Sequence, residues 1–469
     1  MEVAIQRSNG GDYVAALLTS LNLAIYYYLH HLLLFPPDSA YKLACYFTNW
    51  EQYRPQPATF TPANVDPSLC THLIYAFADL KDNQLTTKEP NDEILYRQLN
   101  DLKDRNNALL TLLAVGGGIF ENTKFTIMVS SPENRRKFIR TTKHFLRLHK
   151  FDGLELDWEY PGFRGRAPEE KHQFTILIQE LLAAFVEEGE ETGRPRLLLS
   201  AAVSSNKYIV DAGYEIAELG KSLDLINVMT YDFHGSWAPV TGHNSPLHKG
   251  LETYDPVPFY NCEYAMKYWK DNGAPAEKLL MGFPTYGRTF RLTSSNTGVG
   301  APASGGGTPG NYTKTSGVLA YYEVCGFLQG ATKEWIEEQE VPYAFKDEDW
   351  VGYDDEKSFQ LKAEFLKREK YGGAMIWTLG MDDFSGMFCG EGAYVLTLGL
   401  GHLDKAPGGG SEGGCKTLGS ASSPLHPRHV PEAQLQPGRR GSWYDCFYSS
   451  HGGDGSGNCG QRTLMLGLQ

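Results

Sequence analysis

FDGLELDWEYPG, at residues 151–162, is the stretch that decides the fold and the chemistry of this chain. Successive side chains of an extended strand point to opposite faces, so Glu155, Asp157 and Glu159 share one face and apolar residues the other. Three carboxylates on one side of an apolar strand repel one another, and burial there raises at least one pKa enough to hold a proton at neutral pH. A carboxyl group in that state can serve as a general acid. The alternative is a solvated strand edge with paired surface charges, and the triplet alone does not decide between the two.

The composition argues against some classes of function. The chain has 469 residues, a formal net charge of -13 and a pI of about 5.5, and nucleic-acid phosphates demand clustered Lys and Arg instead. Aromatic residues make up 12% of the chain, and their faces suit sugar rings as well as a core. Eight cysteines are too few for a disulfide scaffold in a chain of this length, but they fit a secreted protein with a few bridges.

The N-terminal segment favours export. Residues 14–35 are largely apolar and are followed by small residues before Tyr41, so residues 1–40 are interpreted as a signal peptide cleaved after Ala40. The segment is atypical, because it carries Glu2 and Asp12, and two histidines interrupt the apolar run. A membrane anchor is the alternative, since the run is nearly long enough to span a bilayer.

Beyond residue 41, short apolar runs alternate with helix-like stretches such as residues 132–149 and 169–190. Near-continuous apolar runs are typical of strands buried on both faces of a parallel sheet. Eight such strands with intervening helices predict an α/β fold, a (β/α)8 TIM barrel, although a doubly wound sheet shows the same alternation. Polar residues at the carboxyl ends of barrel strands indicate a catalytic site. The predicted strands are residues 42–48, 72–80, 108–115, 154–158, 197–202, 223–229, 279–284 and 373–378.

Two regions fall outside this alternation. Residues 288–355, between the seventh and eighth strands, are too long for one helix and contain aromatic and β-branched runs, which predict a small α+β insertion subdomain. The barrel is predicted to span residues 41–402. Residues 403–469 are rich in Pro, Gly, Ser and Arg without apolar periodicity, and are interpreted as a linker-like tail.

Several ordered motifs together carry a family resemblance. The segment at 151–162 resembles the DxxDxDxE signature of the family 18 glycoside hydrolases, the chitinases, and the chain is most similar to the secreted animal members and their inactive lectin-like relatives. The resemblance covers roughly residues 41–402. The other matching motifs are CYFTNW (45–50), MTYDFHGSW (229–237), GFPTYGRTF (282–290), LAYYEVC (319–325) and GGAMIW (372–377).

This resemblance implies endo-hydrolysis of β-1,4-linked N-acetylglucosamine polymers with retention, assisted by the substrate's own N-acetyl group. Glu159 matches the family acid, Asp157 the carboxylate that orients the acetamido group, and Tyr231 the tyrosine that supports the developing oxazolinium ion. Glu155 completes the catalytic set, and Trp377 matches the aromatic floor under the sugar. Without the motifs, aromatic residues near strand ends are more often packing residues. The implied substrate-binding residues are Tyr46, Trp50, Gly117, Gly118, Met229, Asp232, Trp237, Tyr286, Arg288, Glu323 and Trp377.

The resemblance also implies two disulfides, Cys45–Cys70 and Cys325–Cys389, with Cys262 as an additional cysteine. Residues 443–459 faintly resemble the start of a chitin-binding module, but the whole tail supplies three of the six expected cysteines (Cys415, Cys446 and Cys459), so we expect an incomplete remnant without binding function.

Other polar residues are assigned more modest roles. Asn311 begins an Asn-Tyr-Thr glycosylation acceptor, which is meaningful only in a secreted protein. Asp152 lies off the inward face and is expected to be structural. His234 has no metal-ligand spacing around it, so neither a metal nor a cofactor is expected.

Three departures from the family pattern bear on activity. Glu155 stands where the family has Asp, and the longer side chain should share a proton with Asp157, so we expect altered activity or a shifted pH optimum. Gly118 and Ile119 stand where the family carries Trp and Asn, and the missing stacking platform should weaken binding by about 1–3 kcal/mol. Gly380 replaces an acid in the loop that follows the last strand, a change to which the sequence assigns no consequence.

Two other interpretations stay open. The first is a catalytically weak or inactive chitin-binding lectin of the same family; because family lectins typically lack Glu at the acid position, Glu159 favours the enzyme. The second is an unrelated barrel enzyme of small-molecule metabolism, which requires the ordered motifs to be coincidental. On the favoured interpretation the partners are chitin and chito-oligosaccharides, with no nucleic acid and no stable membrane association after signal-peptide cleavage. The protein is then a secreted, extracellular monomer.

Overall fold

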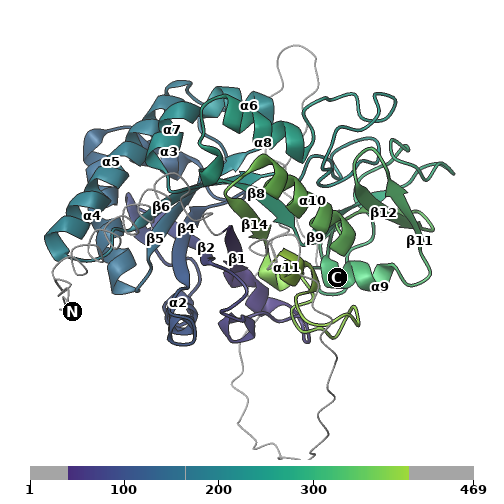
Figure 1. Ribbon diagram of the computed structural model, residues 1–469, viewed down its shortest axis with the longest axis horizontal. Helices are drawn as coiled ribbons and strands as arrows, with labels where there is room; N and C mark the ends of the chain where they lie inside the picture. Colours follow the sequence, from purple (N-terminus) through teal and green to yellow (C-terminus); the bar gives the residue numbers. More distant parts are fainter. Residues whose placement is uncertain (1–40, 164, 401–469) are drawn as a thin grey trace, which may run out of the picture. The chain divides into compact units, whose positions relative to one another are not determined.

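The computed structural model describes residues 41–163 and 165–400; the predicted signal peptide and tail lie outside these residues. Within them, eight parallel strands close into a barrel (Figure 1), because β1 is hydrogen-bonded to β14 on one side and to β2 on the other. Closure excludes the doubly wound sheet, and the predicted TIM barrel is confirmed. The barrel strands are β1 (Lys42–Thr48), β2 (His72–Lys81), β4 (Leu110–Gly116), β5 (Gly153–Asp157), β6 (Leu198–Ser204), β7 (Leu225–Met229), β8 (Leu279–Pro284) and β14 (Gly373–Trp377).

Helices follow most of the strands and cover the barrel from outside (Figure 1). Helix α4 starts where the sequence predicts: Ser131 accepts a hydrogen bond from the Asn134 amide at 3.2 Å, and Pro132 occupies the first turn. Its Phe138 and Leu146, two turns apart, both lie on the buried face of the helix. The helices are α2 (Asp92–Asn100), α3 (Thr123–Val129), α4 (Pro132–Leu148), α5 (Glu169–Thr192), α6 (Lys207–Gly213), α7 (Ile216–Ser222), α8 (Cys262–Asp271), α10 (Glu356–Glu369) and α11 (Val395–Leu400).

A second sheet lies between β8 and β14 in the chain, as the sequence predicts. Its strands are antiparallel and follow the order β10-β9-β13-β12-β11. Phe290 and Trp350 form its core, and both are fully buried. The first strand of this sheet begins at Tyr286, separated from the end of β8 by Thr285 alone, so it carries two of the predicted site residues, Tyr286 and Arg288. Its elements are β9 (Tyr286–Arg291), β10 (Val318–Ala320), α9 (Tyr321–Phe327), β11 (Thr332–Ile336), β12 (Val341–Lys346) and β13 (Asp349–Gly352).

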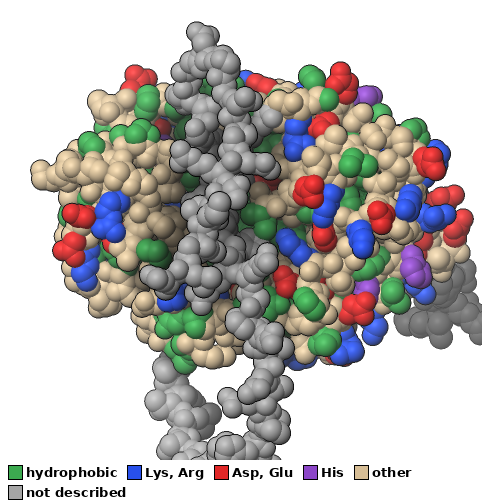
Figure 2. All heavy atoms as spheres, turned by 180° about the vertical axis from the view of Figure 1, so that it is seen from behind, with side chains coloured by type: hydrophobic (Ala, Val, Ile, Leu, Met, Phe, Trp, Pro, Cys, Tyr) green, Lys and Arg blue, Asp and Glu red, His purple; other side chains and the backbone are tan. Residues whose placement is uncertain are grey.

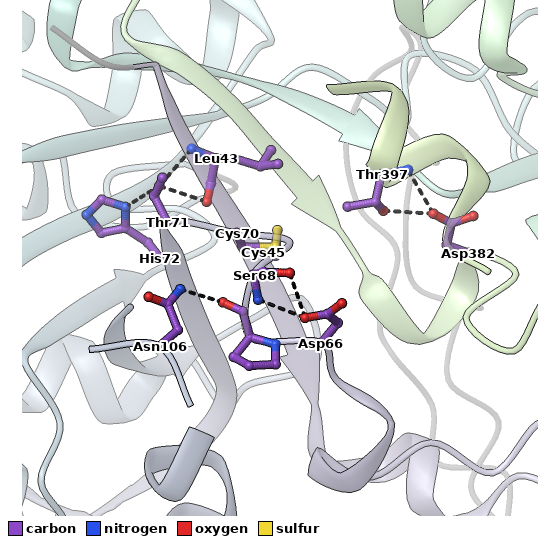
Figure 3. The surroundings of a disulfide bond; sticks show 11 residues. Leu43, Cys45, Asp66, Ser68, Cys70, Thr71, His72, Asn106, Asp382 and Thr397 are labelled. Atoms are coloured by element: carbon purple, nitrogen blue, oxygen red, sulfur yellow. Dashed lines mark hydrogen bonds between the residues drawn. A yellow bond between two sulfur atoms is a disulfide. The ribbon is translucent and has the colours of Figure 1, made fainter. Parts of the chain in front are cut away.

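Both disulfides that the resemblance implies are present. Cys45–Cys70 ties β1 to the segment that enters β2 (Figure 3), where the Thr71 hydroxyl donates to the Leu43 carbonyl and accepts from the Leu43 amide. This bridge and the two hydrogen bonds fix neighbouring strands at the amino-terminal end of the barrel, opposite the strand ends that carry the site residues.

Cys325–Cys389 ties helix α9 of the insertion to the loop that follows β14. Cys262 is a buried free thiol. On the face seen in Figure 2, acidic and basic side chains are interspersed. In residues 41–163 and 165–400, every helix is too short or too polar to cross a membrane.

Candidate active site

A single pocket collects the residues at the carboxyl ends of the barrel strands, together with residues from the loops and from β9. All of the predicted catalytic and substrate-binding residues except Glu155, Tyr46, Gly117 and Glu323 line it. The residues that line the pocket are Trp50, Phe77, Lys88, Gly118, Ile119, Asp157, Glu159, Tyr160, Ser204, Ser205, Asn206, Ile209, Met229, Tyr231, Asp232, Phe233, Trp237, Tyr260, Tyr286, Arg288 and Trp377.

The three carboxylates of the β5 segment lie at successive positions along one face. Glu155 is fully buried inside the barrel, and Asp157, at the end of β5, is 3% exposed and reaches the pocket. Glu159 lies two residues beyond the end of the strand and lines the same pocket. The strand therefore starts and ends one residue earlier than the predicted 154–158, while Asp157 and Glu159 still line the same pocket.

Glu155 is held by three donors from three different strands. Its carboxylate accepts hydrogen bonds from the Tyr46 hydroxyl at 2.7 Å, from the Asn227 amide at 3.0 and 3.2 Å, and from the Ser200 hydroxyl. Burial raises the pKa of Glu155, and these hydrogen bonds oppose that rise because they favour the ionised form. That Glu155 shares a proton with Asp157 stays a prediction.

Asp157 is the residue whose protonation the site perturbs most clearly. Burial raises the pKa of Asp157 well above its usual value, and the nearby charges of Glu159 and then Glu155 raise it further. Its Oδ1 atom is buried and finds no hydrogen-bond partner among the described residues. An unpaired acceptor at the floor of a pocket is a place for a ligand N–H group.

Tyr231 lies at the other side of the same acids. Its hydroxyl points to the sulfur of Met375 at 3.8 Å, and its ring is 9% exposed. Burial raises the pKa of Tyr231 well above its usual value, and the charge of Asp157 adds to this, so the phenol keeps its proton. It can thus donate a hydrogen bond into the pocket.

Asp232, next along the chain, anchors the wall that the insertion contributes. Its carboxylate accepts hydrogen bonds from the Tyr286 hydroxyl at 2.5 Å and from the Arg288 Nε at 2.8 Å, and it pairs with Arg288 Nη2 at 2.6 Å. The Arg288 guanidinium also lies 5.0 Å from the centre of the Trp237 ring. Asp232 adopts a left-handed backbone with φ of 60°, and its amide donates to Asn244 Oδ1 at 3.0 Å. The predicted Asp232, Trp237, Tyr286 and Arg288 thus form one connected group.

Aromatic rings form the opposite wall. The Trp377 ring, at the end of β14, lies 5.0 Å from Tyr46, 6.0 Å from Phe77 and 6.2 Å from Trp50 between centroids. Phe77 and Trp50 stack on one another at 6.0 Å. Apolar ring faces opposite a set of carboxylates suit a ligand with both CH-rich faces and polar edges, as a sugar has.

Comparison with known proteins identifies the family. The profile of "Glycosyl hydrolases family 18" matches residues 42–382. The chain is a family 18 glycosyl hydrolase by descent. It is 53% identical to chitotriosidase-1 of Mus musculus over 359 residues, which is 76% of this chain and 77% of that protein. It is 52% identical to the oviduct-specific glycoprotein of Sus scrofa, over 78% of this chain and 69% of the relative.

Solved structures of the same family agree with the fold. Human YKL-39, described as a pseudo-chitinase with retained chitooligosaccharide binding, superposes with a TM-score of 0.75 at 48% identity, covering 78% of this chain and 99% of that one. The Group IV chitinase of Ostrinia furnacalis, solved with allosamidin, superposes with a TM-score of 0.73 at 36% identity, covering 77% and 98%. These neighbours of the same fold therefore include both a chitinase and a protein described as a pseudo-chitinase.

The remaining predicted residues of the family 18 site have supporting positions. Tyr46 lies behind the pocket and joins Glu155 to Trp377. Gly117 holds a left-handed backbone with φ of 89°, its amide donates to the Asp157 carbonyl at 2.8 Å, and a Cβ there would lie 2.6 Å from the Phe77 ring. Any larger residue at this position would push the aromatic wall away from β5.

Glu323, predicted to bind substrate, does not line the pocket. Its carboxylate accepts hydrogen bonds from the backbone amides of Tyr312, Thr313 and Ala320 and from the Thr313 hydroxyl. These bonds use the side chain to fasten the loop before α9. Asn311, the predicted glycosylation site, is exposed in this same loop.

Sequence reasoning missed several residues that line the pocket. Phe77 comes from β2, and Lys88 comes from the loop after the short strand β3 (Gln84–Thr86). An apolar residue within a buried strand carries no local signal of function. Ser205 and Asn206 directly follow β6, so the strand-end argument could have found them. Tyr260 enters from a long loop, where only the three-dimensional structure brings it close.

Polar residues predicted to be uninvolved have structural partners. His234 is 14% exposed; its Nδ1 lies 3.0 Å from the His243 carbonyl, and burial lowers its pKa. Asp152 accepts a hydrogen bond from the Thr111 amide at 2.8 Å and pairs with Lys103 at 2.5 Å. In the described part of the chain, no group of three or more His, Cys, Asp or Glu residues could hold a metal ion.

Proposed function

We propose that this protein is a chitinase, which hydrolyses β-1,4-linked N-acetylglucosamine polymers internally by a retaining, substrate-assisted mechanism. The observation that carries the proposal is the convergence of Glu159, Asp157 and Tyr231 on one pocket with an aromatic wall. Family membership supports the reaction class, and the retained Glu159 supports turnover rather than binding alone.

In the proposed reaction, Glu159 protonates the oxygen of the scissile bond. The unpaired Oδ1 of Asp157 accepts a hydrogen bond from the acetamido N–H, which orients the acetamido carbonyl oxygen toward the anomeric carbon. The Tyr231 hydroxyl, kept protonated by burial, donates to the same acetamido group as positive charge develops. Attack on the anomeric carbon breaks the glycosidic bond and forms an oxazolinium ion. Water that gives its proton to Glu159 then opens this ion with net retention.

The remaining lining residues would hold the polymer. Trp377 offers a ring face under the sugar whose bond is cleaved, with Trp50 beside it. Asp232 and Arg288 offer charged hydrogen-bonding groups on the insertion side. Because seven barrel strands or the loops directly after them contribute to one groove, together with the insertion, the substrate would touch several independent elements at once.

A second candidate function is a chitin-binding lectin that is catalytically weak or inactive. Two features favour it: Glu155 replaces the family Asp beside the catalytic pair, and Gly118 leaves an exposed glycine where the family has a stacking Trp. YKL-39, whose fold this chain shares, is described as a pseudo-chitinase that retains chitooligosaccharide binding.

One assay separates the two candidates. Wild type and Glu159→Gln are compared for release of a fluorophore from chitobiose and chitotriose glycosides, and for binding of chitotetraose by calorimetry. The chitinase requires turnover by the wild type, loss of turnover in Glu159→Gln, and binding by both. Binding without turnover by either protein refutes the chitinase and supports the lectin. Product lengths from chitohexaose then test internal against terminal cleavage.

We also propose that the protein is secreted, carries glycan at Asn311 and works as an extracellular monomer with chitin or chito-oligosaccharides as its partner. The two disulfides and the similarity to chitotriosidase-1 support an oxidising compartment. Expression in a secreting host, followed by a mass measurement before and after N-glycosidase treatment, tests the cleavage after Ala40 and the glycan together.

A further inference from the structure

Glu51 is a buried carboxylate that the reaction does not use. We propose that it is a positioning residue that holds the Trp377 ring in place for the sugar, an inference that rests on the proposed sugar-binding function. It lies in the short helix Asn49–Tyr53, one residue after Trp50, and is 1% exposed. A buried charge requires specific partners, so the partners of Glu51 show what it holds together.

Its first partner is Arg54. Glu51 Oε1 pairs with Arg54 Nη2 at 3.0 Å, and the other terminal nitrogen of Arg54 donates to the Gly380 carbonyl at 2.8 Å and to the Tyr322 hydroxyl at 3.1 Å. The pair therefore joins the loop after β1 to the loop after β14 and to helix α9 of the insertion. The last two segments each lie more than 250 residues from Arg54 in the chain.

Its second partner leads to Trp377. The Thr378 hydroxyl donates to Glu51 Oε1 at 2.9 Å, and Thr378 is the residue that follows Trp377. On its other side Thr378 is held by Thr285, whose hydroxyl accepts from the Thr378 amide at 3.0 Å and donates to the Thr378 carbonyl at 2.6 Å. The backbone beside Trp377 is thus fixed by Thr285, which lies between β8 and β9, and by Glu51 in the loop after β1.

The geometry also explains Gly380, which stands where the family carries an acid. A Cβ atom at Gly380 would lie 1.9 Å from Glu51 Oε2 and 2.7 Å from the Phe60 ring. The carboxylate of Glu51 therefore occupies the space that a side chain at position 380 would need. The space beside Arg54 holds one carboxylate, and in this chain Glu51, in the loop after β1, supplies it.

A four-way comparison tests this assignment: wild type, Glu51→Ala, Gly380→Asp, and the double variant that carries both changes. Each is measured for chitotetraose affinity, for Tm and for the near-ultraviolet circular dichroism of its aromatic residues. We expect each single variant to bind about tenfold more weakly and to melt several degrees lower. The double variant should recover most of both losses, because the charge returns from position 380 into the emptied space.

Asp354→Ala is the matched control, since Asp354 forms a fully buried pair with Lys362 at 2.6 Å away from the pocket. It should lower Tm without changing affinity or the aromatic spectrum. If Glu51→Ala behaves like this control, Glu51 is merely structural and the proposal is overturned. A double variant no better than its worse single parent also overturns it. If wild type binds no oligosaccharide, the proposed function fails, and the recovery of Tm and of the aromatic spectrum in the double variant decides the role of Glu51 by itself.

Discussion

Removal of one hydroxyl group, by Tyr46→Phe, tests how the barrel keeps a charged group in its interior. The Tyr46 hydroxyl donates to Glu155 Oε1 at 2.7 Å, and both side chains are buried. A hydrogen bond to a charged group contributes about 2 kcal/mol, and the lost donor leaves the carboxylate less well solvated. For a domain of this size, such a loss lowers Tm by about 3 °C.

The loss depends on pH in a defined direction. Burial raises the folded-state pKa of Glu155 above its usual 4.5, and the Tyr46 hydrogen bond partly opposes this rise. Without that bond the folded pKa rises further, so the variant loses more stability than wild type as pH rises through the wild-type folded pKa. Below that pKa, Glu155 is protonated in both proteins. The difference in unfolding free energy between wild type and Tyr46→Phe then shrinks to the contribution of a neutral hydrogen bond, about 1 kcal/mol.

Thermal unfolding followed at pH 4 and pH 7.5 measures both losses, beside the pH dependence of glycoside hydrolysis. Tyr75→Phe is the matched control, because the Tyr75 hydroxyl donates to the buried carboxylate of Asp92 at 2.6 Å outside the pocket. We expect a similar loss of stability from the control but an altered pH profile of hydrolysis only from Tyr46→Phe. Equal losses at the two pH values for Tyr46→Phe would refute the ionised Glu155 on which this reasoning depends.

Three further changes probe the groove and the insertion. Gly118→Trp places an aromatic ring at an exposed position whose φ is not positive. We expect the variant to bind chitotetraose about tenfold more tightly than wild type in calorimetry. Unchanged affinity would contradict the idea that the chain lacks a stacking platform at position 118. Lys88→Met removes a cation from the pocket. Partly deacetylated, positively charged oligomers should therefore bind to the variant about threefold more tightly than to wild type at low salt, and with equal affinity to both proteins at high salt. Replacement of Cys325 and Cys389 by Ser opens a crosslink over 64 residues, which should reduce the unfolding free energy by about 4 kcal/mol in a denaturant titration; a midpoint equal to wild type would contradict this.

The barrel was predictable because its strands are buried on both faces. In an α/β protein, a short unbroken apolar run is stable as a strand that is covered on both faces of a parallel sheet. The observed bounds of β1 and β8, 42–48 and 279–284, are those that the sequence predicts. The end of β5 was less predictable: Trp158 continues the apolar alternation, but the strand ends at Asp157. Alternation records which residues are buried and not where hydrogen bonding to the neighbouring strand stops.

The site was predictable in part, and for a different reason. Asp157 and Glu159 follow from strand parity. Asp232 and Arg288 lie 56 positions apart, and the family resemblance pointed to both residues but not to the contact between them. Glu323 lies in a matching motif, but its carboxylate accepts hydrogen bonds from the backbone of the loop before α9 and does not line the pocket. A matching motif therefore does not by itself place each of its residues in the site. Phe77 lies within β2 between Ala76 and Ala78, so nothing in its immediate sequence distinguishes it from a core residue.

The junction at residue 285 has a practical consequence. Because a single residue separates β8 from β9, and β13 ends shortly before α10, both ends of the insertion are anchored in rigid elements. Exchange of residues 286–352 between two members of the family would replace Tyr286 and Arg288 together while Glu159 and Asp157 remain in place. Chimeras of this kind would separate what the groove recognises from how fast the bond is broken, within one folded protein.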